Sequence, residues 1–134
     1  MLLMHLNSKE KEMFLELASA AVNCNEEMAG SQEEMMLVFR EEADLPPEDY
    51  TIRNVPLDEI LSFFKESPTY IQRIVFLEMM SIITADGEYR PEEKDFIEKI
   101  KVPFEISDEQ EDDIICSIKQ ISEAYAVMED FVNA

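Results

Sequence analysis

The feature that most limits the possible folds is a series of apolar stretches at helical spacing, each bounded by capping residues or proline. We expect helices at about residues 8–22, 32–42, 57–64, 68–84, 91–101 and 108–131. No stretch alternates between apolar and polar residues as a strand does, and only two glycines are present for tight turns. The sequence therefore predicts an all-α fold, a compact bundle of about six helices.

The helix expected at 68–84 is apolar on nearly every side, which is typical of a helix at the centre of a core. Polar residues interrupt it, so we do not expect it to insert into a membrane. Glu78 falls on its apolar arc, where a carboxylate must find donors, reach an edge or stay protonated. We expect Glu78 to cap or bridge a neighbouring element; a ligand or catalytic acid is the alternative.

The last expected helix, at about 108–131, carries a regular apolar stripe. Its members lie four and three residues apart: Ile114, Ile118, Ile121, Tyr125, Met128 and Val132. This is heptad spacing, so a homodimer through a coiled-coil seam is one interpretation. Packing lengthwise over the domain's own core explains the same stripe, and we favour that interpretation.

Two parts of the chain share the order helix, acidic turn, capped helix. Residues 14–19 match residues 76–81 at an offset of 62. In this match Glu16 corresponds to Glu78. Glu16, however, lies at the border of its own apolar arc, so we expect its side chain to be in solvent.

The second helix of each part also matches, with a first turn that is three residues longer, because residues 31–34 correspond to residues 90–93. An offset of 59 aligns Leu37 and Val38 with Phe96 and Ile97, which would keep the core positions in phase. We therefore expect one domain over residues 1–134, built from pseudo-symmetric hairpins at about 8–42 and 68–101. The short third helix would bridge the hairpins, and the helix at about 108–131 would close the bundle.

The turn after the central helix has a distinctive composition. Residues 82–88 read Ile-Ile-Thr-Ala-Asp-Gly-Glu, and residues 90–94 read Arg-Pro-Glu-Glu-Lys. Gly87 can adopt the left-handed conformation that ends a helix, and the acids after Pro91 suit the first turn of the next one. An EF-hand loop is excluded, because Ile82 would occupy its first ligand position.

This turn resembles the TerB-like family of bacterial tellurite-resistance proteins, over about residues 9–100. Family members combine a long apolar helix, an Ala-Asp-Gly-acid turn and a Pro/Ser-Glu-Glu helix start. The resemblance implies duplicated helical hairpins in a bacterial cytoplasmic protein linked to tellurite or related stress resistance. It also implies association with membrane proteins or metal ions, and no established enzymatic activity. The first turn departs from the pattern, because Cys24 stands where the second has Asp86.

The acidic turn is also the best candidate for a metal site. Carboxylate oxygens suit divalent cations, and the turn could offer four residues: Asp86, Glu88, Glu92 and Glu93. Helix capping explains the same residues without a ligand, and we favour capping.

The net charge further limits the classes of function that the chain can have. The chain has 31 acidic against 11 basic residues, a net charge of −20, which argues against nucleic-acid binding and favours a basic protein surface or a divalent cation. His5, in an N-terminus expected to be loose, is the only histidine, and Cys24 and Cys116 lie too far apart in sequence to indicate a disulfide framework. We expect a non-enzymatic acidic interaction module in the cytoplasm, without catalytic residues or cofactor. It would dock a basic or membrane-associated partner protein, and cation binding at residues 86–93 is the alternative.

Overall fold

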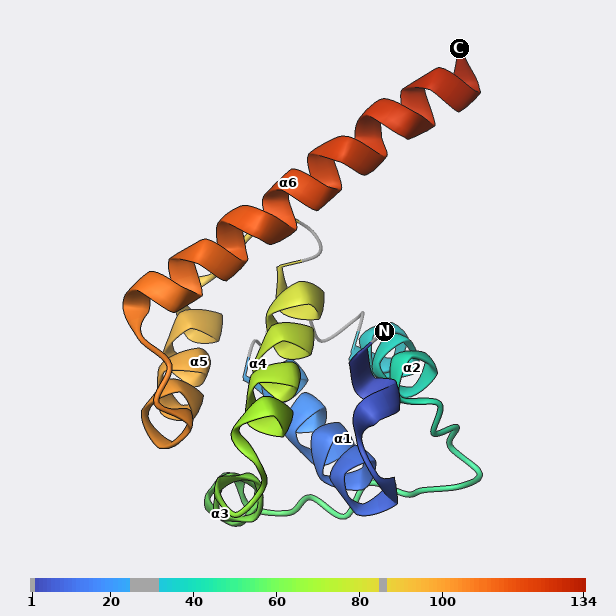
Figure 1. Ribbon diagram of the computed structural model, residues 1–134. Helices are drawn as coiled ribbons and strands as arrows, with labels where there is room; N and C mark the ends of the chain where they lie inside the picture. The colour runs from blue at the N-terminus through green and yellow to red at the C-terminus, as the bar shows by residue number, and fades with distance from the viewer. Residues whose placement is uncertain (1, 25–31, 85–86) are drawn as a thin grey trace.

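The computed structural model describes residues 2–24, 32–84 and 87–134 (Figure 1). They form a short 3₁₀ helix and six α-helices: η1 (Leu2–His5), α1 (Ser8–Asn23), α2 (Gln32–Ala43), α3 (Leu57–Lys65), α4 (Thr69–Ile83), α5 (Pro91–Phe104) and α6 (Asp108–Asn133). No strand occurs in these residues. The predicted all-α helical bundle is therefore confirmed.

Most helices begin where their capping residues predict. Asn7 caps α1, and Ser107 caps α6 in the predicted capping box with Gln110. Ser31, the expected cap of α2, lies outside the described residues. Pro68 is itself the cap of α4, so that helix begins one residue later than we predicted.

The end of α5 differs more clearly, because the helix continues through Pro103 to Phe104. The C-cap is Glu105, which is left-handed with φ 54°. The N–H of Ile106 then donates to the carbonyl of Lys101 at 3.0 Å. This hydrogen bond satisfies a carbonyl of the last turn and fixes the helix end beyond the proline.

α4 lies at the centre of the molecule, as its composition predicts. It packs against η1, α1, α3, α5 and α6. The core around it contains four phenylalanine rings that are almost wholly buried: Phe14, Phe39, Phe64 and Phe76. The helix that was expected to be apolar on nearly every side is therefore covered on most sides.

The burial of side chains follows the predicted repeat along α1 and α4. At the offset of 62, residues 13–21 and 75–83 have the same burial at every position except one. The exception is Leu15, which is buried, whereas Leu77 is half-buried. Glu16 and Glu78 are both buried, so the expectation of a solvated Glu16 is wrong.

The predicted alignment of α2 with α5 is wrong. Leu37 is 57% exposed, whereas Phe96, its expected counterpart, is buried. An offset of 61 fits better, since it pairs the buried Phe39 and Ala43 with Ile100 and Phe104. The difference arises because a helix that begins after a turn of different length rotates by 100° for each added residue.

Each repeat also contains a short leading helix. η1 packs against α4 and α2, and α3 packs against α1 and α5. The leading helix of each repeat therefore packs against the other repeat. α3 therefore bridges the two hairpins and also leads the second repeat. The expectation of a loose N-terminus is wrong, because Leu3 of η1 is fully buried.

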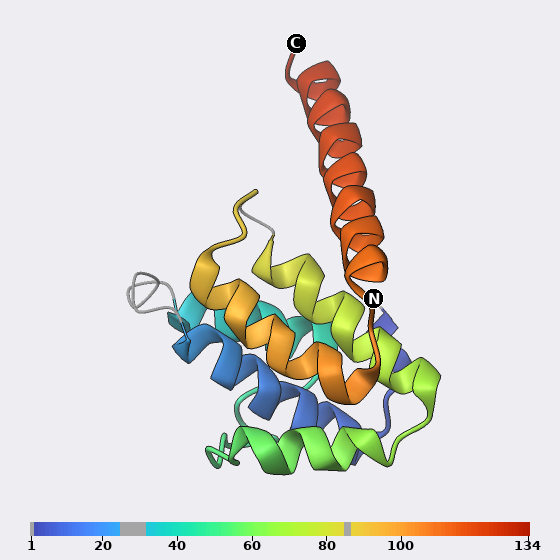
Figure 2. The same ribbon diagram turned by 90° about the vertical axis from the view of Figure 1, so that its left-hand side faces the viewer.

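α6 covers the bundle only with its N-terminal half. There Ile114, Ile115 and Ile118 pack against the core, and the helix contacts α4. The C-terminal half extends beyond the bundle (Figures 1 and 2). The interpretation that the whole stripe packs over the domain's own core is wrong for this half.

None of the described helices combines the length and the apolar composition that crossing a membrane requires.

Candidate functional site

The described part of the acidic turn is organised around Arg90. Its guanidinium lies 2.8 Å from an oxygen of Glu88 and 3.7 Å from one of Glu93. Glu93 also accepts the N–H of Arg90 at 2.9 Å, so this buried carboxylate caps α5. Gly87 is left-handed with φ 84°, as we predicted.

The predicted four-carboxylate metal set is only partly described. Asp86 lies outside the described residues. Glu92 is exposed in the first turn of α5, near the thiol of Cys24. Because Glu88 and Glu93 already contact a guanidinium, the described part of this turn functions as a helix start.

Glu16 joins α1 to the loop that precedes α3. One carboxylate oxygen accepts the hydroxyl of Tyr50 at 2.5 Å and the N–H of Arg53 at 2.8 Å. The other accepts the N–H of Val55 at 3.0 Å. Burial raises the pKa of Glu16, but these hydrogen bonds outweigh it and hold the pKa below its usual value.

Glu78 occupies the corresponding position on α4 and serves the other leading helix. Its carboxylate accepts the N–H of Leu2, at the start of η1, at 3.1 Å. The expectation that Glu78 bridges a neighbouring element is confirmed. Both buried glutamates thus fix the start of a leading helix on the opposite repeat, which explains why acids occupy two core positions.

A second cluster, which sequence reasoning missed, joins α5 to α6. The ammonium of Lys101 is buried, and it lies 2.9 Å from Glu98 and from Glu111 and also contacts Asp108. Tyr89 donates its hydroxyl to Glu111 at 2.7 Å. We call these five residues the Lys101 cluster.

The three carboxylates of the Lys101 cluster are close enough together to hold a cation. The ammonium of Lys101 already takes that place. Burial lowers the pKa of Lys101, but its three acidic partners outweigh this and hold the pKa above the usual value for lysine. Burial, followed by the hydrogen bond to Glu111, raises the pKa of Tyr89. The cluster is therefore a structural contact that joins α5 to α6 through the ammonium of Lys101.

A signal for this cluster is present in the sequence. Lys101 lies four residues after Ile97 and three before Phe104, on the apolar face of its helix. A lysine there requires partners, by the same reasoning that singled out Glu78. The partners themselves come from α6 and from the turn, so the helix pattern alone does not identify them.

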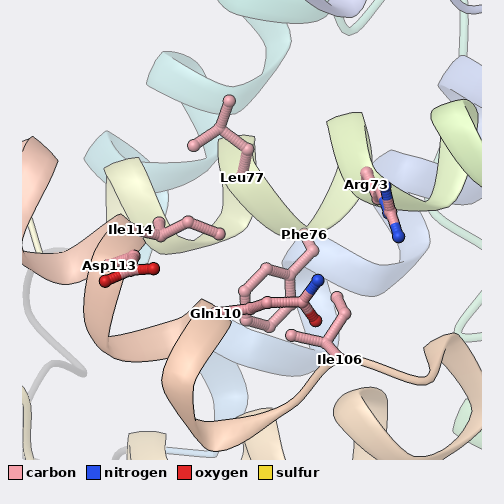
Figure 3. A pocket seen from close by; sticks show the side chains of 7 residues that line it. All are labelled: Arg73, Phe76, Leu77, Ile106, Gln110, Asp113 and Ile114. Atoms are coloured by element: carbon pink, nitrogen blue, oxygen red, sulfur yellow. The ribbon is translucent and has the colours of Figure 1, made fainter.

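A pocket of about 320 Å³ lies between α4 and α6, close to the acidic start of α6 (Figure 3). Phe76, Leu77, Ile106 and Ile114 line it with apolar surface, and Arg73, Gln110 and Asp113 supply polar groups from both sides. The pocket is large enough for an apolar side chain of a partner. Its lining contains no nucleophile paired with a base.

The described cysteine beside the first turn does not resemble a nucleophile. Burial, and then the carboxylates of Glu93 and Glu92, raise the pKa of the Cys24 thiol. A raised pKa keeps the thiol protonated and unreactive near neutral pH.

Acidic side chains are concentrated at the start of α6. Six acidic residues and no basic one occur from Glu105 to Asp113. Two of them, Asp108 and Glu111, belong to the Lys101 cluster, and the exposed Asp112 lies on the same side of α6 as they do. Asp113 lines the pocket, and Glu109 is exposed one turn before it on the same helix. Glu109, Asp113 and the pocket form a single surface, which we call the α4–α6 surface.

Comparisons with protein-family models, with curated proteins and with solved structures found no match to this chain.

Proposed function

We propose that this protein is a non-enzymatic interaction module of the tellurite-resistance and stress type, which docks a basic or membrane-associated partner protein in the cytoplasm. The observation that carries the proposal is the α4–α6 surface, where an apolar pocket lies beside exposed acids. Interfaces commonly combine an apolar anchor in a pocket with charged groups around it. The link to tellurite resistance rests on the TerB-like resemblance alone.

The distribution of the buried acids supports a non-enzymatic role. Glu10, Glu16, Glu78 and Glu93 each accept a backbone N–H, at a helix start or from a neighbouring segment. These carboxylates serve the fold. The exposed acids are left to act on other molecules, and they are best suited to attract a positively charged protein surface.

The test is affinity purification with the tagged full chain from cells that produce it, at about 50 mM and about 500 mM NaCl. We expect a basic protein to be retained at low salt and lost at high salt. Replacing Glu109→Lys and Asp113→Lys should abolish its retention, because both changes lie on the α4–α6 surface.

The matched control is Glu41→Lys with Glu48→Lys, which changes the net charge equally at exposed positions elsewhere. The control should keep the partner. Equal loss in both variants would mean that net charge alone governs retention, and retention at high salt would exclude an electrostatic mechanism.

The cation alternative makes a separate prediction. Thermal unfolding of chelator-treated protein should shift no more with Ca²⁺, Mg²⁺ or Zn²⁺ than with NaCl at equal ionic strength, because Arg90 already contacts Glu88 and Glu93. A specific ion at 100 times its dissociation constant would stabilise the fold by about 2.7 kcal/mol. Such a shift, lost in Asp86→Asn and kept in Asp49→Asn, would favour the cation alternative over our proposal.

A further inference from the structure

The C-terminal half of α6 carries an apolar surface that no other described element covers. Its members are Ile121, Tyr125, Met128, Phe131 and Val132, each between 52% and 83% exposed. We call this surface the α6 stripe. Its core residues continue the four-and-three spacing of Ile114 and Ile118, which do pack against the bundle.

We propose that the α6 stripe binds the α6 stripe of a second copy of this chain in an antiparallel two-helix seam. In this register Ile121 lies opposite the partner's Val132, and Tyr125 lies opposite the partner's Met128. The two chains form four layers in this way, from Ile121, Tyr125, Met128 and Val132 of each chain. Aromatic and sulfur-containing side chains are in contact at the centre.

The exposed area fits a dimer. The five side chains expose roughly 600 Å² per chain, so two copies that cover each other would bury about 1,000 Å² in total, which is the lower limit for a specific interface. A patch of that extent is at the upper end for a monomer.

The bundle selects the antiparallel direction. Ile114 and Ile118 lie on the same face of α6 as the stripe, one heptad earlier, and this face is occupied there by the bundle. In a parallel pair the partner's residues 108–118 would run along that face and collide with the bundle. The antiparallel pair needs no residue before 121.

Charge also favours a second copy over a lipid surface. From residue 119 onward the chain carries only one lysine and three acidic residues, and Glu123 and Asp130 lie on the side opposite the stripe. Helices that bind anionic membranes are rich in lysine and arginine on their polar face. The antiparallel arrangement also places the two acidic bundles at opposite ends of the seam, which limits their repulsion.

The test is sedimentation of the full chain over a concentration series up to about 100 µM. We expect a species of twice the 15.6 kDa chain mass. Tyr125→Glu with Met128→Glu should weaken self-association by about 100-fold or more. Ala126→Glu with Val127→Glu is the matched control, because both residues are exposed and neither lies in a layer of the seam, and this variant should remain dimeric.

Direction is tested by cross-linking in a chain with Cys24→Ala and Cys116→Ala. One variant carries Ile121→Cys and a second carries Val132→Cys. A mixture of the two should form a disulfide-linked dimer, and neither variant should do so alone. A monomer at every concentration, or dimerisation that survives Tyr125→Glu with Met128→Glu, overturns the proposal. Linkage of Ile121→Cys chains to themselves overturns the antiparallel register. Because the α4–α6 surface is intact in all of these variants, partner retention is unaffected by either result.

Discussion

Replacing Glu16 with alanine is expected to lower the free energy of unfolding by about 3 kcal/mol, because it leaves two backbone N–H groups and a tyrosine hydroxyl without their acceptor. Glu16→Gln should lower the free energy of unfolding by less, about 2 kcal/mol. The glutamine keeps one side-chain oxygen as an acceptor, but its NH₂ group faces the remaining N–H or O–H donors. Urea unfolding monitored by circular dichroism measures both. Glu41→Ala, at an exposed site on α2, should change stability by less than about 0.5 kcal/mol.

The effect of Glu16 should depend on pH in a defined direction. Its pKa is lower in the folded protein than the usual 4.5, so ionised Glu16 stabilises the fold above that pH. The advantage of the wild type over Glu16→Gln should therefore be complete near neutral pH and decline as the pH falls through the lowered pKa. A difference that stays constant from pH 7 to about pH 3 would contradict this assignment.

Replacing Lys101 with methionine is expected to cost about 2 kcal/mol, because it leaves Glu111, which is 12% exposed, beside two other carboxylates without the ammonium. The contacts with Asp108 and Glu98 contribute less, since both acids are exposed. Lys99→Met, at an exposed position on the same helix, is the control and should be nearly neutral.

The Lys101 variant should also gain a property that the wild type lacks. Three carboxylates without the ammonium form an oxygen site, so Ca²⁺ or Mg²⁺ should restore part of the lost stability beyond a NaCl control at equal ionic strength. The pH dependence of the wild type gives a second check. The raised pKa of Lys101 means that its contribution is complete below about pH 10 and is lost as the pH rises further.

The sequence predicts the helices and the α1–α4 repeat because both depend on local patterns. Capping residues and proline define the helix starts, and the spacing of apolar residues defines the buried faces, as at Asn7 and Ser107. η1 is not predictable from such patterns, because four residues are too few to show a helical period. Which face of α2 is buried is not predictable in this way either, because the rotation of a helix depends on the length of the turn before it.

The candidate site was less predictable, because its contacts join distant segments. Glu16 is buried by a loop that lies more than 30 residues later and has no periodic pattern. The direction of α6 depends on the Lys101 cluster and on the packing of Ile114, whereas the apolar stripe is compatible with either a covered or a projecting helix. Sequence reasoning correctly placed an unusual acid at Glu78 but could not identify Leu2 as its partner.

The most direct test of the proposed function is photo-crosslinking in living cells from single positions on the full chain. A photoreactive amino acid at Asp113, beside the pocket, should link the chain to a basic protein, and the same group at Glu48 should not. The link from position 113 should be lost when the cells are lysed in high salt before illumination. Equal products from both positions, or a product from 113 that persists in high salt, would contradict docking at the α4–α6 surface.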